Sequence, residues 1–568
     1  MSVRIHRTVV GAALVAALLA TTPAVSSAVG TTTTTHQEHE AVTAAGENDS
    51  RTAAERLYGV GTGYGQSGSA TVHGTLSPAP VALTTGDEDN GSIASAMATG
   101  IGTGSVRAVT TSGTLGDGPH GVLGDKTNDF DFYKVAGQAG QTLTVSTDGS
   151  AASTNTVVGL YDAAGQLLAS DDDNGVGALS KLQYPITATA DYYVAVAGKS
   201  ALGDFPADPQ NSGSGLGGAD TGAYQLLIAS APVDRDFYAV KLAAGDVLGA
   251  ALGTSGDRLT VLRPNGSVAV GTDVHSLGKL PTASTLPRGA VDLAVVADQA
   301  GWYAVSVTDG FGGYDLNLGV NRPSVDDAPQ TVFLDFDGGS IDLAPLGGTG
   351  VRQLSGLASY LPNWGLTAAD EAAVIAKATA TVRENLRTDA VRAGYDVNVR
   401  IRTSADDTDT FGSPNVSRVV IGGKTSESGI GRIGTAQSID VGNVAHEETA
   451  LVQLDRISAA AGPLSLNTYL GATSNRIAFV GTALGNLASR ELGALYGAAP
   501  TDPASTTSTL MDADGNFPGL YGVGADGLGG TADDVDVDFK SDTYNPATGL
   551  TGSQNSLNAI AWGITAPC

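Results

Sequence analysis

The 568-residue chain is organised around one stretch near its C-terminal end, Gly481-Thr-Ala-Leu-Gly-Asn-Leu-Ala-Ser-Arg-Glu491-Leu-Gly-Ala-Leu-Tyr-Gly497-Ala-Ala-Pro-Thr-Asp502. Residues 481 to 496 are expected to form a helix. Gly497 follows that helix, and Glu491 is the first carboxylate of the stretch.

The stretch resembles the active-site helix of metzincin-type zinc metallopeptidases, whose pattern is H-E-x-x-H-x-x-G-x-x-H, here in the variant H-E-L-G-H-x-x-G-x-x-H-T-D. The positions that fall in register are Glu491, Leu492, Gly493, Gly497, Thr501 and Asp502. In that family three histidines hold Zn²⁺, the metal lowers the pKa of a bound water, and the glutamate takes its proton. The resemblance therefore implies that Glu491 stands at the position of the general base.

The three histidine positions hold Arg490, Ala494 and Pro500. None of these side chains has an electron pair to give to a metal. The chain has seven histidines, and only His446 lies within residues 323 to 568, so a three-histidine zinc site is not expected there. Met511 lies downstream, where the resemblance places the methionine turn, and an ordinary core methionine is the alternative.

Residues 1 to 28 have the basic start, short apolar run and small residues of a secretory signal peptide, with a membrane anchor as the alternative. We therefore expect a secreted, extracellular protein with no membrane span after cleavage. The single cysteine, Cys568, excludes an intramolecular disulfide. A formal net charge of −28 argues against nucleic acid as a partner.

An internal repeat precedes the C-terminal region. The block from Asp129 to Leu143 aligns without a gap on the block from Asp234 to Leu248, and alternating apolar residues predict antiparallel β-sandwiches. Residues 87 to 230 resemble the bacterial pre-peptidase C-terminal domain, and residues 231 to 322 resemble a second, shorter copy. The resemblance implies that both accompany a secreted peptidase and are not catalytic. The first copy's aspartates are calcium candidates or simple turn caps: Asp129, Asp131, Asp171, Asp172 and Asp173.

Residues 29 to 86 are rich in Gly, Ser and Thr and are expected to be a disordered linker. His36 and His39 lie in it, and solvated histidines are the favoured interpretation over a metal site.

Residues 323 to 568 are expected to form an α+β zincin-like domain, so the predicted fold class is two β-sandwiches followed by that domain. Strands are predicted at 331 to 336, 396 to 402 and 417 to 421, and helices at 367 to 386 and 442 to 461. The run His446-Glu447-Glu448 is interpreted as a surface feature.

Carboxylates gather between Gly524 and Phe539 among flexible glycines. Oxygen ligands of this kind suit calcium, and a solvated acidic turn is the alternative. The predicted calcium ligands are Asp526, Asp533, Asp534 and Asp536.

The sequence thus favours a metallopeptidase-like protein that has lost its zinc ligands and binds a peptide or an extracellular protein without catalysis. An active secreted metallopeptidase with a different metal site is one alternative. A structural protein of the cell envelope or matrix is another. Oligomeric state and binding partner are left open by the sequence.

Overall fold

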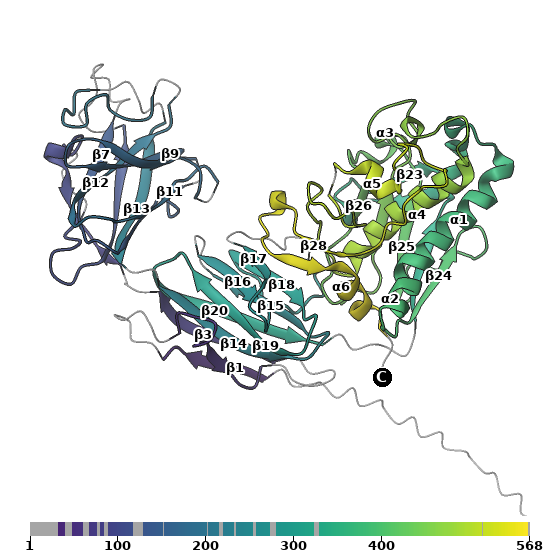
Figure 1. The fold of residues 1–568 in the computed structure, drawn as a ribbon, viewed down its shortest axis with the longest axis horizontal. Helices are drawn as coiled ribbons and strands as arrows, with labels where there is room; N and C mark the ends of the chain where they lie inside the picture. The colour runs from purple at the N-terminus through teal and green to yellow at the C-terminus, as the bar shows by residue number, and fades with distance from the viewer. Residues whose placement is uncertain are drawn as a thin grey trace, which may run out of the picture. The chain divides into compact units, whose positions relative to one another are not determined.

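A computed structural model describes residues 32–39, 48–60, 68–76, 80–84, 89–116, 129–151, 153–175, 177–200, 203–214, 220–231, 234–253, 257–272, 280–322, 329–513 and 515–565. Strands make up 36% of the structure and helices 17%. The described strands form five sheets of five strands and two of two strands (Figure 1). The predicted signal peptide lies outside the described residues.

The predicted fold class is wrong in its last element. The chain is β-rich and built from many small sheets, and no clear α+β zincin domain is formed. The physical reason lies in the strands and loops beyond residue 329. Strands there are short, long irregular loops separate them, and among the described residues only α1, α4 and α6 are helices of eight residues or more.

Two five-stranded sheets enclose the core of what we call the first sheet pair. One sheet has the order β10 (Leu167–Asp171), β9 (Thr156–Asp162), β12 (Ala190–Gly198), β7 (Phe130–Gly137), β5 (Met97–Ala98). The other has the order β11 (Lys181–Pro185), β8 (Thr142–Ser146), β13 (Gly222–Ala231), β6 (Ala108–Leu115), β4 (Val81–Ala82). Alternate residues of both sheets, such as Val135 and Ile228, point into one shared apolar core.

The second sheet pair repeats this arrangement strand for strand. Its first sheet runs β17 (Val268–Thr272), β16 (Arg258–Leu262), β19 (Gly301–Thr308), β14 (Arg235–Leu242), β2 (Glu55–Leu57). Its second sheet runs β18 (Val291–Val296), β15 (Val247–Leu252), β20 (Gly312–Asn321), β3 (Gly68–Leu76), β1 (Thr32–Gln37). In each sheet pair, the first two strands in sequence are parallel to the strands beside them. These are β4 beside β6 and β5 beside β7 in the first sheet pair, and β1 beside β3 and β2 beside β14 in the second.

The expectation of a disordered linker over residues 29 to 86 is therefore wrong for the residues described there. Strands β1, β2 and β3 supply to the second sheet pair what β4, β5 and β6 supply to the first. The second copy is not shorter: the first sheet pair is inserted between its third and fourth strands. Strand β3 has the burial of a core strand, with every second residue buried.

The C-terminal region holds a mixed sheet with the order β24 (Val399–Thr403), β21 (Gln330–Asp335), β25 (Val416–Ile421), β27 (Thr449–Val452), β26 (Gly434–Ala436). Strand β26 is an edge strand and is antiparallel to β27. The smaller sheets are β22 (Gly338–Asp342) with β23 (Val351–Ser355), and β28 (Ser541–Thr543) with β29 (Ser553–Asn555). Strands β21, β24 and β25 of the mixed sheet confirm the three strands predicted from the sequence.

The helices of this region are α1 (Glu371–Arg383), α2 (Asp389–Arg392), α3 (Thr425–Ser428), α4 (Arg476–Leu495), α5 (Phe517–Tyr521) and α6 (Ser556–Gly563). A capping box between Thr367 and Asp370 precedes α1. A π-helical turn, Glu384–Thr388, joins α1 to α2. The predicted helix over 442 to 461 is wrong, because β27 occupies its centre with four buried residues. Among the described residues, no helix combines the length and apolar character needed to cross a membrane.

Candidate functional site

Helix α4 carries the motif and is held against α1 by two glycines. The Asn475 side chain caps the helix by accepting a hydrogen bond from the Ala478 amide at 3.1 Å. A Cβ on Gly481 would lie 2.6 Å from Lys377 Cβ, and one on Gly485 would lie 2.6 Å from Thr381 Cβ. The two helices therefore approach more closely than side chains would allow, which fixes the position of α4.

Gly497 turns the chain away from the end of α4. Its φ of +96° is disfavoured for residues with a Cβ, and a Cβ would lie 2.8 Å from Val441 Cα. The Ala498 amide closes the turn by donating to the Gly493 carbonyl at 2.8 Å. This turn carries the chain back to Pro500 beside the helix.

One pocket of about 340 Å³ brings the motif residues together. Its walls include the three residues at the family's histidine positions, which are Arg490, Ala494 and Pro500, together with Glu491 and Met511. Edge strand β26 forms another wall, through Gly434, Thr435 and Ala436. Residues more than twenty positions apart in sequence thus line one cavity.

Arg490 and Glu491 form an ion pair at the pocket, with Nη1 and Oε1 3.6 Å apart. Both side chains are largely buried, at 14% and 8% exposure. A Cβ at Gly434 would collide with the Glu491 carboxylate, so the absence of a side chain on the edge strand makes room for it. The guanidinium places a fixed positive charge at the pocket wall.

Met511 lies beneath the helix, since its Sδ would be 2.6 Å from a Cβ on Gly493. The segment that carries it is tied to Thr501, whose amide donates to the Met511 carbonyl at 2.8 Å. The Thr501 hydroxyl donates to Asp512 Oδ1 at 3.1 Å. Thr501 and Met511 therefore belong to one hydrogen-bonded unit, of which Met511 lines the pocket.

Buried acids lie beside the pocket wall, where the sequence suggested a surface feature. Glu448 and Asp440 are both completely buried. Burial raises the pKa of Glu448 to about 8, with nearby Asp440 adding to the effect and Ser438 opposing it. His446 instead contacts Asn415 Oδ1 through Nδ1 at 2.7 Å. The surface interpretation of this run is wrong for Glu448.

In the predicted calcium loop, aspartate side chains accept hydrogen bonds from backbone amides of the same loop. Asp526 accepts from the Leu528 amide at 2.8 Å, Asp533 from the Asp526 amide at 2.9 Å, and Asp534 from the Gly530 amide at 2.8 Å. Together with Asp536, these residues do not form a close group of ligand atoms among the described residues. A calcium site in this loop remains a prediction.

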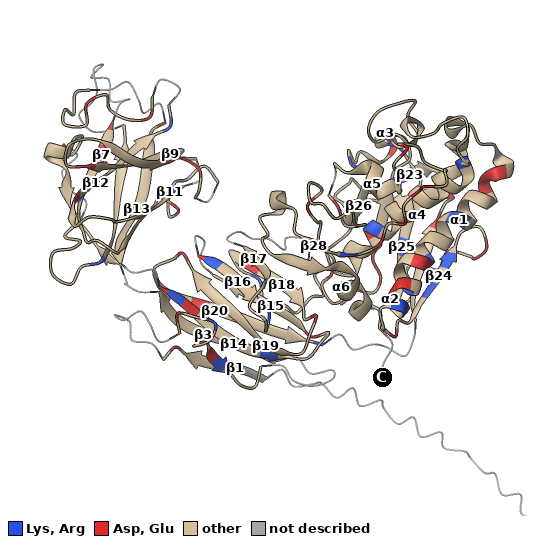
Figure 2. Cartoon of the chain, in the orientation of Figure 1, with Lys and Arg blue, Asp and Glu red and all other residues tan. Residues whose placement is uncertain are grey.

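A different acidic group forms at the π-helical turn. Ligand atoms of Glu384, Asp389 and Asp538 all lie within 4.8 Å of one another. Burial, then Asp389, raises the pKa of Glu384 to about 8. Figure 2 shows the acidic positions along α1 and α2. The sequence did not reveal this group because Asp538 lies about 150 positions after Glu384 and Asp389.

The aspartates of the first sheet pair mostly meet protein donors. Asp131 accepts from the Tyr224 hydroxyl at 2.6 Å, and Asp129 accepts from the Gly116 amide at 2.9 Å. Asp171 accepts from the Lys181 amide at 2.8 Å, and Asp172 pairs with Lys199. Asp173 follows them in the same turn.

No protein-family model matches the chain, and no curated protein matches it. Among solved structures, the chain is similar to the Aeromonas hydrophila protein PliG, a periplasmic lysozyme inhibitor of g-type lysozyme. That similarity has 15% identity and a TM-score of 0.16, over 27% of this chain and 99% of that one. It is also similar to a putative secreted protein from Eubacterium rectale, with 12% identity and a TM-score of 0.16 over 38% and 74%. Similarities this weak carry no argument about fold or function.

Proposed function

We propose that the chain is a secreted, metallopeptidase-like protein without catalytic activity that binds an extended acidic peptide along edge strand β26. The observation that carries this proposal is the pocket in which Arg490, Ala494 and Pro500 meet beside that strand. A zinc-dependent hydrolase would need electron-pair donors at those positions, and these three side chains have none.

Strand β26 offers a site for an added strand. Among the strands that the structure describes, it pairs only with β27, on one side. The residues that flank β26 continue its hydrogen bonding with β27: the Gln437 amide donates to the Thr449 carbonyl, and the Ile433 carbonyl accepts from the Gln453 amide. At alternate positions, Gly434 and Ala436 turn their backbone groups toward the open edge. An extended peptide binds such an edge through main-chain hydrogen bonds.

Charge at the pocket selects the peptide. Two arginines, Arg432 and Arg490, line it against one carboxylate, that of Glu491. The local excess of positive charge stands out in a chain with a net charge of −28. Arginine pairs with carboxylates through a planar fork, so a glutamate or aspartate of the peptide suits this pocket best.

The test measures binding of fluorescent ten-residue peptides that alternate valine with glutamate, glutamine or lysine. We expect the glutamate peptide to bind roughly tenfold more tightly than the glutamine peptide, which corresponds to about 1.4 kcal/mol. Arg432→Ala should abolish that preference. Arg400→Ala is the matched control, because Arg400 is exposed on β24 at the opposite edge of the same sheet.

A second test uses the variant Ala436→Pro. Proline removes the backbone N–H that points toward the open edge of β26, and this N–H takes no part in the hydrogen bonds with β27. The variant should weaken binding of all three peptides alike. Cleavage of any peptide in the presence of Zn²⁺ would refute the non-catalytic part of the proposal. Equal binding of the glutamate and lysine peptides would refute the part on charge.

A further inference from the structure

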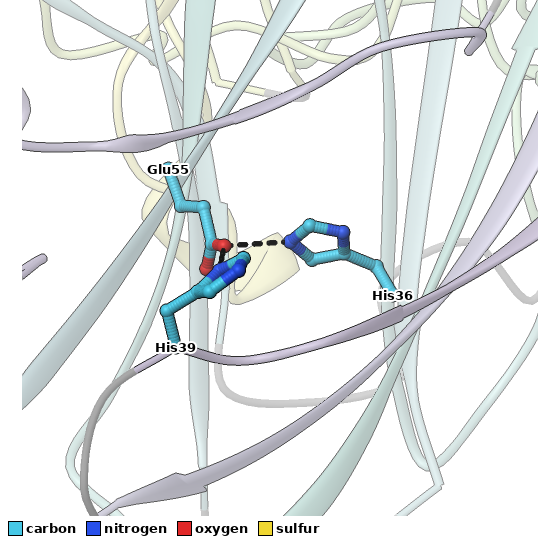
Figure 3. Close-up of side chains that lie close together, drawn as sticks. All are labelled: His36, His39 and Glu55. Atoms are coloured by element: carbon cyan, nitrogen blue, oxygen red, sulfur yellow. Dashed lines mark hydrogen bonds and ion pairs between the residues drawn. The ribbon is translucent and has the colours of Figure 1, made fainter.

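Two histidines and a glutamate meet where the two sheets of the second pair have their edges. His36 belongs to β1, the edge strand of one sheet, and Glu55 begins β2, the edge strand of the other. His39 follows β1 by two residues. One ligand atom from each of the three residues lies within 4.8 Å of the others. Figure 3 shows both imidazoles directed toward the Glu55 carboxylate.

The contacts converge on a single oxygen. Glu55 Oε1 lies 2.8 Å from Nε2 of His36 and also contacts Nδ1 of His39. Nε2 of His36 is shielded from solvent. Its contact with Glu55 is an ion pair without the geometry of a hydrogen bond, and the atom makes no hydrogen bond to another described residue. The side chain of Glu55 is 14% exposed and that of His39 is 76% exposed. The group is therefore enclosed on the Glu55 side and open to solvent on the His39 side.

The first sheet pair shows what the same place looks like without this group. Glu55 is opposite Tyr238 in the parallel pairing of β2 with β14, and Met97 is opposite Tyr133 in the equivalent pairing. Met97 packs on the apolar core of the first pair. At this position an apolar residue in one copy is a carboxylate in the other.

The position of His36 gives the same result. His36 is opposite Val72, two residues before Gly74. In the first copy, the residue two positions before Gly113 is Thr111 on β6. The register of β4 with β6 places Leu83, the residue after β4, opposite Thr111. Leu83 also packs on the first core. The second copy has thus exchanged an apolar pair for a histidine and a glutamate, which pack less favourably unless they bind something.

We infer that His36, His39 and Glu55 form a binding site for a divalent transition-metal ion of the zinc class. Two imidazoles and a carboxylate are ligands that zinc accepts, and three protein ligands leave a fourth position for water on the open side. The ion would join the edge strands of both sheets and fix the N-terminal strand.

The first experiment titrates the metal-free full chain with Zn²⁺ alone, in competition with a chelating dye. We expect one equivalent to bind, and Co²⁺ to give the visible absorption of a tetrahedral site. His39→Ala and Glu55→Gln should each weaken binding by about 100-fold or more. His73→Ala should leave it unchanged, because His73 lies on β3 of the same sheet and pairs with Asp315 at 2.6 Å. Unchanged binding in His39→Ala would overturn the inference.

The second experiment guards against misfolding of a single variant. The double variant His36→Leu with Glu55→Met places the first copy's residues in the second copy, so it should fold. Zn²⁺ should raise the Tm of the wild type by on the order of a few °C and leave that of the double variant unchanged. Equal shifts in both proteins, or no shift in the wild type, would show that the site is not here.

Discussion

The hydroxyl of Tyr314 donates a hydrogen bond to Oδ2 of buried Asp236 over 2.6 Å. It lies at the same distance from the hydroxyl of Tyr238. The first sheet pair contains the same arrangement, in which Tyr224 donates to Asp131 at 2.6 Å. Each copy thus has a polar network inside its apolar core, and such networks are costly to leave incomplete.

Tyr314→Phe should lower the free energy of unfolding by about 1–3 kcal/mol, because it removes the donor to a buried carboxyl group. Burial raises the pKa of Asp236 to about 9, and the bond from Tyr314 opposes that rise. Urea denaturation monitored by fluorescence measures the loss. Tyr58→Phe is the control, since Tyr58 is 72% exposed and should change the stability by less than about 0.5 kcal/mol. A loss no larger than that of the control would show that the network contributes nothing.

These networks also explain how far the repeat could be predicted. Asp236 and Tyr238 lie in the block from Asp234 to Leu248 that aligns with residues 129 to 143, whereas Tyr314 lies outside it. Strand β3 escaped the sequence comparison because the whole first sheet pair separates β3 from β14 along the chain. A signal was nevertheless present: Gly-Thr-Leu occurs at 74–76 and at 113–115, and each glycine makes room for one tyrosine ring.

Glu448→Gln should flatten the decline of stability with rising pH. The pKa of Glu448 is raised from 4.5 to about 8 in the folded protein, so the folded state keeps a proton that the unfolded state has released. This contribution is fully present below about pH 4.5 and is lost as the pH rises through 8. The difference in unfolding free energy between variant and wild type should change by about 2–4 kcal/mol between pH 5 and pH 8. A constant difference across that range would contradict the prediction.

Gly497→Ala should destabilise the chain by about 2–3 kcal/mol, through the strained φ and the contact with the Val441 backbone. Gly429→Ala is the matched control. Gly429 also has a positive φ, of +73°, but a Cβ there would meet no atom within 4 Å. It should cost only about 1 kcal/mol. Thermal unfolding of both variants measures the difference, and equal losses would mean that the turn after α4 is not constrained by its neighbour.

The site could be predicted only in part, for two physical reasons. Alignment with the zinc-binding motif identified Arg490, Ala494 and Pro500 from the sequence, because a helix and the turn that follows it are close together in sequence. The surroundings are not local. The short apolar run Thr449–Val452 fits a buried strand or a helix equally well by its pattern, and only its neighbours β25 and β26 decide. Glu448 is buried for the same reason.

Glu384→Gln should stabilise the chain at pH 8 and have little effect at pH 4. Glu384 lies near Asp389 and Asp538, and its pKa of about 8 means that deprotonation adds a negative charge to a partly buried acidic group. The amide removes that charge and keeps the shape of the side chain. Tm measured with a chelator present should therefore rise at pH 8 and stay unchanged at pH 4. Glu371→Gln, on the first turn of α1 and outside the group, is the control and should show no such pH-dependent gain. If Glu384→Gln instead lowers the Tm at pH 8, the carboxylate is stabilised in the folded state, and repulsion is not the dominant force at this turn.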